Sequence, residues 1–350
     1  MKKFLITGAN GFVGKPLCAE LLRQGQSVRA AVRSANPPVE NVEVAIVGST
    51  DGKTDWSDAL RGADVVIHLA ARVHMMKDTA VDPLAEFIKV NLYGTSNLAL
   101  QAARAGVKRF VYVSSVKVNG ESTAPTLFPG PSDRTTSHST RRQSRQVAGY
   151  PSRGEGKRVF SESDVPDPQD PYAISKWRAE QDLQRIAQET GLEVVIVRPP
   201  LVYGPGVKGN FSRLMAAIDK GIPLPLSGAN NVRSLVYVGN LVDALIICAT
   251  HPAAAGQTYL VSDGEDVSTA MLVEKIAQAL ERNSRSFYFP PSLLRAAAAM
   301  LGRSEQIARL FGSLRVNDEK IRRELAWSPP YTLEQGVHAT AEWYRSRHLR

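Results

Sequence analysis

Tyr172 and Lys176 are a pair of residues whose types and spacing suit proton transfer. They lie four positions apart in a segment that predicts a helix, so their side chains leave the same helix face. A tyrosine hydroxyl group titrates near about pH 10 in water, and a neighbouring ammonium group favours the phenolate form. We therefore expect Lys176 to lower the pKa of Tyr172, which would make this hydroxyl group a general acid or base. The pair alone is weak evidence, because this spacing also arises by chance.

A serine and a glycine-rich turn strengthen the interpretation. Ser115 follows a predicted strand, at the sheet edge where ligands of doubly wound folds bind, and its hydroxyl group could hold a substrate oxygen. Between the first predicted strand and helix stands the segment Thr7-Gly8-Ala9-Asn10-Gly11-Phe12-Val13-Gly14. Such a turn lets a pyrophosphate rest on backbone N–H groups and on the positive end of the helix dipole. Together these features indicate hydride transfer between a nicotinamide dinucleotide and a carbinol carbon.

The end of the second predicted strand bears on the choice of dinucleotide. NAD-binding sequences usually carry an acidic residue about 20 positions past the glycines, which binds the ribose hydroxyl groups. Arg33 and Ser34 stand at this strand end, with no acid. They could hold a 2′-phosphate by charge-assisted hydrogen bonds, although Arg33 could also be an ordinary surface charge. We expect NAD(P)(H) as cofactor, with NADP(H) preferred.

The elements that must position these residues follow a regular pattern. Predicted strands cover residues 3–7, 27–33, 42–47, 65–69 and 110–114, with helical patterns between them. A helix begins after the N-cap Asp170, with Pro171 at its first position, and ends near Glu189, and a further strand covers residues 193–198. Continuous apolar strands separated by helices predict an α/β fold with a doubly wound, Rossmann-like parallel sheet.

Two interleaved domains are expected. Residues 1–200 would form the dinucleotide-binding domain, with a flexible insertion at about 121–160, and residues 201–350 would form mainly a smaller mixed α/β substrate-binding domain. Two strand-like segments at about 233–262, residues 234–238 and 258–261, are expected to return to the sheet or its edge. Short helices are predicted around residues 210–220, 292–311 and 333–346.

Composition excludes several classes of protein. The chain has 350 residues, 43% of them hydrophobic, and no stretch approaches the length of apolar residues that a membrane span needs. Cys18 and Cys248 are far apart, so we expect no disulfide framework, no metal site and a cytoplasmic location. Much of the net charge of +9 lies in the Ser- and Arg-rich insertion, which has no interleaved aromatic residues. We therefore expect a solvated loop, with no nucleic-acid partner and no membrane partner.

Several motifs together resemble the extended branch of the short-chain dehydrogenase/reductase family, which contains nucleotide-sugar epimerases, dehydratases and reductases. The resemblance spans nearly the whole chain except the insertion. It is carried by the glycine turn and by His68-Leu69-Ala70-Ala71, Val90-Asn91-Leu92-Tyr93-Gly94-Thr95, Ser114-Ser115-Val116, Tyr172-Ala173-Ile174-Ser175-Lys176, Arg198-Pro199-Pro200-Leu201-Val202-Tyr203-Gly204-Pro205-Gly206 and Arg233-Ser234-Leu235-Val236-Tyr237-Val238.

The resemblance implies roles for individual residues. The catalytic set would be Ser115, Tyr172, Lys176 and Asn91, with Asn91 positioning the lysine through water. Cofactor contacts are expected from Gly8, Asn10, Gly11, Phe12, Val13, Gly14, Arg33, Ser34, Leu69, Ala70, Ala71, Tyr172, Lys176 and Pro199. Substrate contacts are expected from Lys117, Asn119, Asn210 and Arg233, where the planar fork of Arg233 suits a diphosphate. Members of this branch are commonly homodimers built on the helices around Asn91 and Tyr172.

The resemblance also implies a UDP-sugar as substrate and C4 of the sugar as the reacting carbon. Lys117 and Asn119 replace the small residue and the tyrosine of typical UDP-glucose 4-epimerases, and the missing ribose acid favours an exchangeable NADPH. We therefore expect reduction of a UDP-4-keto-6-deoxy-N-acetylhexosamine, with 4-epimerisation of a UDP-hexose or UDP-N-acetylhexosamine as the alternative. A 4,6-dehydratase is disfavoured because no carboxylates follow Ser115. A catalytically silent NAD(P)-binding regulatory protein is a further alternative, against which the intact Ser115, Tyr172 and Lys176 argue.

Overall fold

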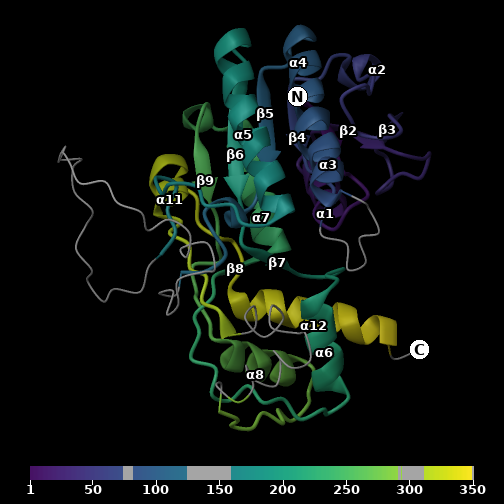
Figure 1. The fold of residues 1–350 in the computed structure, drawn as a ribbon. Helices are drawn as coiled ribbons and strands as arrows, with labels where there is room; N and C mark the ends of the chain where they lie inside the picture. Colours follow the sequence, from purple (N-terminus) through teal and green to yellow (C-terminus); the bar gives the residue numbers. More distant parts are fainter. Residues whose placement is uncertain (74–81, 124–158, 291–292, 294–310, 349–350) are drawn as a thin grey trace, which may run out of the picture.

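A seven-stranded parallel sheet forms the centre of the computed structural model, which describes residues 1–73, 82–123, 159–290, 293 and 311–348. The strand order is β3-β2-β1-β4-β5-β6-β9, and every neighbouring pair is parallel. The strands are β1 (Lys3–Thr7), β2 (Ser27–Val32), β3 (Glu43–Ile46), β4 (Val65–His68), β5 (Arg109–Val113), β6 (Glu193–Arg198) and β9 (Thr258–Leu260). The predicted doubly wound α/β fold is confirmed (Figure 1).

Helices cover both faces of this sheet, which is why its strands are apolar throughout. One face packs against α1 (Gly14–Arg23), α7 (Val238–Thr250) and α11 (Glu319–Leu325). The other face packs against α2 (Ser57–Leu60), α4 (Thr95–Arg104) and α5 (Pro171–Thr190). The chain enters α4 through α3 (Pro83–Phe87) and a π-helical segment, η1 (Ile88–Gly94). Short 3-10 turns, η2 (Val116–Val118) and η4 (Pro252–Ala254), follow β5 and α7.

A smaller lobe lies below the carboxyl edge of the sheet in Figure 1. It contains α6 (Asn210–Asp219), α8 (Thr269–Ala279), α12 (Leu333–His348) and a separate two-stranded parallel sheet of β7 (Leu201–Tyr203) and β8 (Leu235–Tyr237). Its core has its own cluster of buried side chains, including Phe211, Met215 and Ile276. The expectation that residues 234–238 return to the main sheet is wrong, because β8 pairs with β7. The second returning segment does join the sheet, as β9 beside β6.

The two ends of the predicted insertion pack against the segment before α11. The Thr123 N–H donates to the Ser313 carbonyl at 2.8 Å, and Phe160, which is 1% exposed, forms a β-bridge with Val316. Residues 124–158, where most of the predicted loop falls, lie outside the described residues. So does most of the helix predicted at 292–311.

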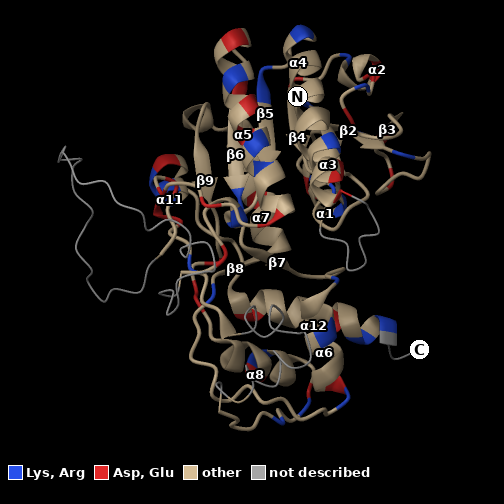
Figure 2. Ribbon diagram, in the orientation of Figure 1, with Lys and Arg blue, Asp and Glu red and all other residues tan. Residues whose placement is uncertain are grey.

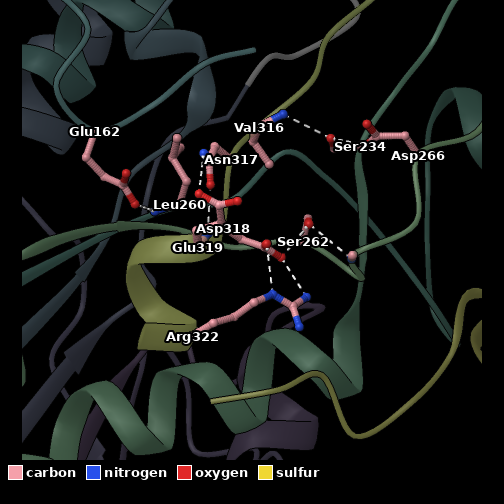
Figure 3. Close-up of polar contacts among 11 residues, drawn as sticks. Glu162, Ser234, Leu260, Ser262, Asp266, Val316, Asn317, Asp318, Glu319 and Arg322 are labelled. Carbon is pink, nitrogen blue, oxygen red and sulfur yellow. Dashed lines mark hydrogen bonds and ion pairs between the residues drawn. The ribbon is translucent and has the colours of Figure 1, made fainter. Parts of the chain in front are cut away.

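Polar contacts fasten the end of β9 to α11 (Figure 3). Ser262 donates to Asp318 at 2.7 Å, and Asp318 accepts two hydrogen bonds of 2.9 Å from Arg322. Beside them, the Leu260 N–H donates to Glu162 at 2.8 Å. Residues distant in sequence are thereby joined at one sheet edge. In Figure 2 both basic and acidic residues lie along α5 and α11.

The described helices include none that combines the length and the apolar character needed to cross a bilayer. Cys18 and Cys248 are buried free thiols.

Candidate active site

The turn between β1 and α1 has a shape that only glycine permits. A Cβ on Gly14 would lie 2.2 Å from the Gly8 carbonyl oxygen, and a Cβ on Gly8 would lie 2.8 Å from the Ala70 nitrogen. Gly8 also has a φ of +66°, and its carbonyl accepts a 2.8 Å hydrogen bond from the Gly11 N–H. The main chain of Leu69 and Ala70 therefore passes directly against the turn. A bare, tightly bent backbone at the start of a helix fits the pyrophosphate of a dinucleotide.

Other predicted cofactor residues lie within this turn or next to it. Phe12 packs toward Gly206, so the turn reaches the smaller lobe, and Val13 packs against the core beneath α1. The Asn10 side chain donates to the Asn36 carbonyl at 3.0 Å. Ala71, three residues after the end of β4, is half-buried.

Arg33 and Ser34 come directly after β2 and are exposed, as a residue that binds an incoming phosphate would be. Directly after β6, the buried Pro199 accepts a 3.0 Å hydrogen bond from the Val116 N–H through its carbonyl. This contact ties the end of β6 to η2, the turn that follows Ser115.

The helix that carries Tyr172 and Lys176 is defined at both ends. Asp170 accepts a 2.6 Å hydrogen bond from the Ala173 N–H, and Pro171 occupies the first turn. The helix ends at Gly191, whose φ of 75° is left-handed. This fixes α5 beside β5, and the Lys176 Nζ donates to the Val113 carbonyl at 2.8 Å.

The pKa of Tyr172 is shifted opposite to the prediction. Burial, assisted by the negative charge of Asp170, raises this pKa to about 12, and the nearby Ser115 side chain opposes the shift. Burial also lowers the pKa of Lys176 to about 7, against the influence of Glu180. The expectation that the lysine acidifies the phenol is therefore wrong for the protein alone, because both groups are desolvated. Ser115 nevertheless lies close enough to Tyr172 to lower its pKa, so the two predicted side chains do come together.

Asn91 lies next to this pair, on η1. Its side chain donates to Ser175 at 3.0 Å and exchanges hydrogen bonds of 2.8 and 3.0 Å with the main chain of Arg72. Ser175 precedes Lys176, so Asn91 fixes α5 directly through this neighbour.

The predicted substrate residues divide into two groups. Lys117 forms ion pairs with Asp170 at 2.5 Å and with Glu121 at 2.8 Å. The half-buried Arg233 lies close enough to Glu121 for that carboxylate to influence its pKa, which burial lowers. Lys117 and Arg233 thus lie around a shared carboxylate, beside the start of α5.

Asn119 is placed differently from the prediction. It is 1% exposed, accepts a 3.0 Å hydrogen bond from Arg198 and donates at 2.7 Å to the Ser161 carbonyl. Its side chain is engaged inside the protein, so it is a structural residue. Asn210 is exposed at the first residue of α6.

Sequence patterns missed a buried polar set behind the site. Arg198 holds Glu180 at 2.5 and 3.0 Å, and Ser114 donates to the same carboxylate. Tyr112 lies under Lys176, with its ring centroid 4.6 Å from Nζ. Glu180 could have been found from its position four residues after Lys176, whereas nothing in the sequence marks Tyr112 apart from an ordinary core residue. No group of three or more His, Cys, Asp or Glu side chains among the described residues could hold a metal ion.

Comparison with known proteins agrees with this geometry. Residues 4–262 match the family described as the NAD dependent epimerase/dehydratase family. A UDP-glucose 4-epimerase of Vibrio cholerae is 40% identical over 343 residues, covering 97% of this chain and 95% of that protein. The structure of MoeE5 in complex with UDP-glucuronic acid and NAD has a TM-score of 0.72 at 24% identity, with 99% of each chain covered. The UDP-N-acetylglucosamine 4-epimerase from Bacillus cereus has a TM-score of 0.72 at 17% identity, covering 99% of this chain and 100% of that one.

Proposed function

The chain belongs to the NAD dependent epimerase/dehydratase family of extended short-chain dehydrogenase enzymes, and from this premise we propose that it is an oxidoreductase acting at C4 of a UDP-sugar. The observation that carries the proposal is the placement of Ser115 and Tyr172 together at the carboxyl edge of the sheet, close enough for the Ser115 side chain to affect the pKa of Tyr172. The glycine turn at Gly8 opens at the same edge.

The chain's own residues account for the proton transfer. When bound, the nicotinamide dinucleotide supplies the donor or acceptor of hydride at C4. Ser115 and Tyr172 would hold the C4 oxygen, and the Tyr172 hydroxyl group would give or take its proton. The protonated Lys176 would lower the cost of forming the phenolate. In the protein alone the raised pKa of Tyr172 keeps its proton in place, as a general acid requires.

Lys117 and Arg233 support the choice of a nucleotide sugar. Arg233 offers a planar fork that suits a diphosphate, and burial strengthens its attraction for an anion. Lys117 would lie nearer the sugar than Arg233 does. It follows Ser115 by two residues and forms an ion pair with Asp170, the N-cap of α5.

Two reactions at C4 have separate support. The Vibrio cholerae relative, a UDP-glucose 4-epimerase, favours 4-epimerisation, in which the sugar is oxidised at C4 and reduced again on its other face. The exposed Arg33 after β2, without an acidic neighbour at the strand end, favours NADP(H) and hence reduction of a UDP-4-keto-6-deoxy-N-acetylhexosamine. The sequence motifs alone favour reduction over 4-epimerisation, and the similarity to this relative strengthens the case for 4-epimerisation.

The experiment separates these reactions by their need for added reductant. Purified protein is incubated with UDP-glucose or UDP-N-acetylglucosamine without reductant, and with UDP-4-keto-6-deoxy-N-acetylglucosamine plus NADPH or NADH. Products are identified by mass and proton NMR. A 4-epimer formed without reductant assigns an epimerase, and a 4-hydroxy product that requires NAD(P)H assigns a reductase. Cofactor binding without any product would contradict the proposal and favour the regulatory alternative.

A further inference from the structure

Lys176 is a buried ammonium group with an incomplete set of oxygen partners among the described residues. It is 3% exposed, and the Val113 carbonyl, at 2.8 Å, is the oxygen acceptor that the structure gives it. An ammonium group has three N–H donors. Two aromatic rings lie beside it, with Nζ 4.6 Å from the Tyr112 centroid and 5.9 Å from the Tyr172 centroid. The shorter distance is well inside the range of a cation–π interaction.

The Tyr112 ring is held rigidly in this position. It is fully buried in β5 and stacks on the His68 ring, with centroids 5.9 Å apart and planes at 20°. His68 is itself fixed, because Thr7 lies 2.6 Å from its Nδ1 and Thr95 lies 3.0 Å from its Nε2. The ring cannot turn away from Lys176 without disturbing the packing of β4 and β5.

The hydroxyl group of Tyr112 does not explain why the residue is placed here. It lies near Thr95 but makes no hydrogen bond of ordinary geometry to any described residue. Burying such a group without a partner costs stability. The ring is therefore the part of Tyr112 that faces a chemically active group.

We propose that Tyr112 is a positioning residue whose ring face holds the Lys176 ammonium group in place and favours its protonated form. The proposal rests on the proposed function, in which Lys176 assists Tyr172. A negative ring face stabilises the cation and has little interaction with a neutral amine.

The groups around Lys176 determine how strongly the Tyr112 ring affects its protonation. Burial lowers the pKa of Lys176 to about 7, and Glu180, one turn later on α5, opposes this shift. Tyr172 faces Lys176 from α5, Tyr112 from β5 and His68 from β4. Since Lys176 titrates near neutral pH, a change in the ring alters the charged fraction under working conditions.

Matched variants separate the ring from the hydroxyl group. Tyr112→Phe keeps the ring and should leave the pKa of Lys176 unchanged, with stability equal or higher. Tyr112→Leu removes the ring and should lower that pKa by about one unit. The pKa is followed in the protein by NMR titration of ¹³C-labelled lysine, with the Lys176 signal assigned from its absence in Lys176→Met.

A second measurement covers the case in which the leucine variant does not fold. Phenylalanine, difluorophenylalanine and pentafluorophenylalanine are introduced at position 112, which keeps the shape while the ring face loses its negative character. The proposal predicts that the pKa of Lys176 falls stepwise with fluorination, and that the alkaline limb of the turnover profile moves to lower pH with it. An unchanged pKa across the series, or equal shifts in Tyr112→Phe and Tyr112→Leu, would overturn the proposal. The titration needs no substrate, so it stands apart from any failure to find turnover.

Discussion

Arg198 and Glu180 form a buried ion pair, with Nη2 of the arginine 2.5 Å from Oε2 of the glutamate. The arginine comes from the end of β6 and the glutamate from the middle of α5, so the pair joins this helix to the sheet. A buried pair is costly to break because the remaining charge has lost its partner.

Glu180→Ala is expected to lower the free energy of unfolding by about 3–5 kcal/mol, measured by urea denaturation. Glu189→Ala on the same helix removes a pair with Arg185 whose side chains are both about half exposed, and it should cost no more than about 1 kcal/mol. Equal losses in the two variants would show that the buried pair has no special role.

Gly14→Ala places a methyl group against the Gly8 carbonyl. We expect it to weaken dinucleotide binding at least tenfold and to reduce stability by about 1–3 kcal/mol, because the backbone must shift. Gly25→Ala, just beyond the other end of α1, is the control, because its φ of +71° also strains an alanine, whereas nothing lies within 4 Å of its Cβ and the residue is outside the turn. Cofactor titration by fluorescence should show full affinity in Gly25→Ala, and undiminished affinity in Gly14→Ala would mean that this turn does not hold the pyrophosphate.

Arg33→Ala tests the proposed preference for NADP(H). Loss of a charge-assisted contact with the 2′-phosphate should raise the dissociation constant of NADPH by about tenfold or more and leave that of NADH unchanged. Arg104→Ala, an exposed residue at the end of α4, serves as control. If NADPH and NADH bind equally well to the unaltered protein, Arg33 does not select the cofactor.

His68 predicts a pH dependence of stability. Burial lowers its pKa to about 3, with Lys176 as a lesser cause. A base with a lowered native pKa binds its proton mainly after unfolding, so its stabilising effect is present above about pH 6.5 and is lost as the pH falls toward 3. Urea midpoints at pH 7 and pH 5 should therefore differ more in the wild type and in His338→Asn than in His68→Asn. If the urea midpoint falls equally between pH 7 and pH 5 in all three proteins, His68 is not the source of the loss of stability.

The strands, the glycine turn and helix α5 were predictable because each depends on local patterns. Apolar runs define β1 to β6, and Asp170 with Pro171 marks the start of α5. The partner of residues 234–238 was not predictable, because strand pairing is decided by distant segments. The pKa of Tyr172 was predicted in the wrong direction for a similar reason: spacing along a helix reveals the neighbouring lysine, whereas desolvation depends on everything packed around both groups.

Asn119 and Tyr112 show the same limit within the site. Asn119 stands in a motif that resembles a substrate loop, yet Arg198 and Ser161 occupy its side chain. Tyr112 looks like a core residue, and only the fold reveals the ammonium group above its ring.

The most direct test of the account measures hydride transfer at C4 in the wild type and in Tyr172→Phe, with UDP-sugar substrates or reductant carrying deuterium at the transferred position. The account predicts that the wild type either delivers the label from the reductant to C4 or retains a C4 label at that carbon in the 4-epimer, and that Tyr172→Phe retains cofactor binding but loses at least about 100-fold in rate. Equal rates in the two proteins, or a product whose label never involves C4, would contradict it.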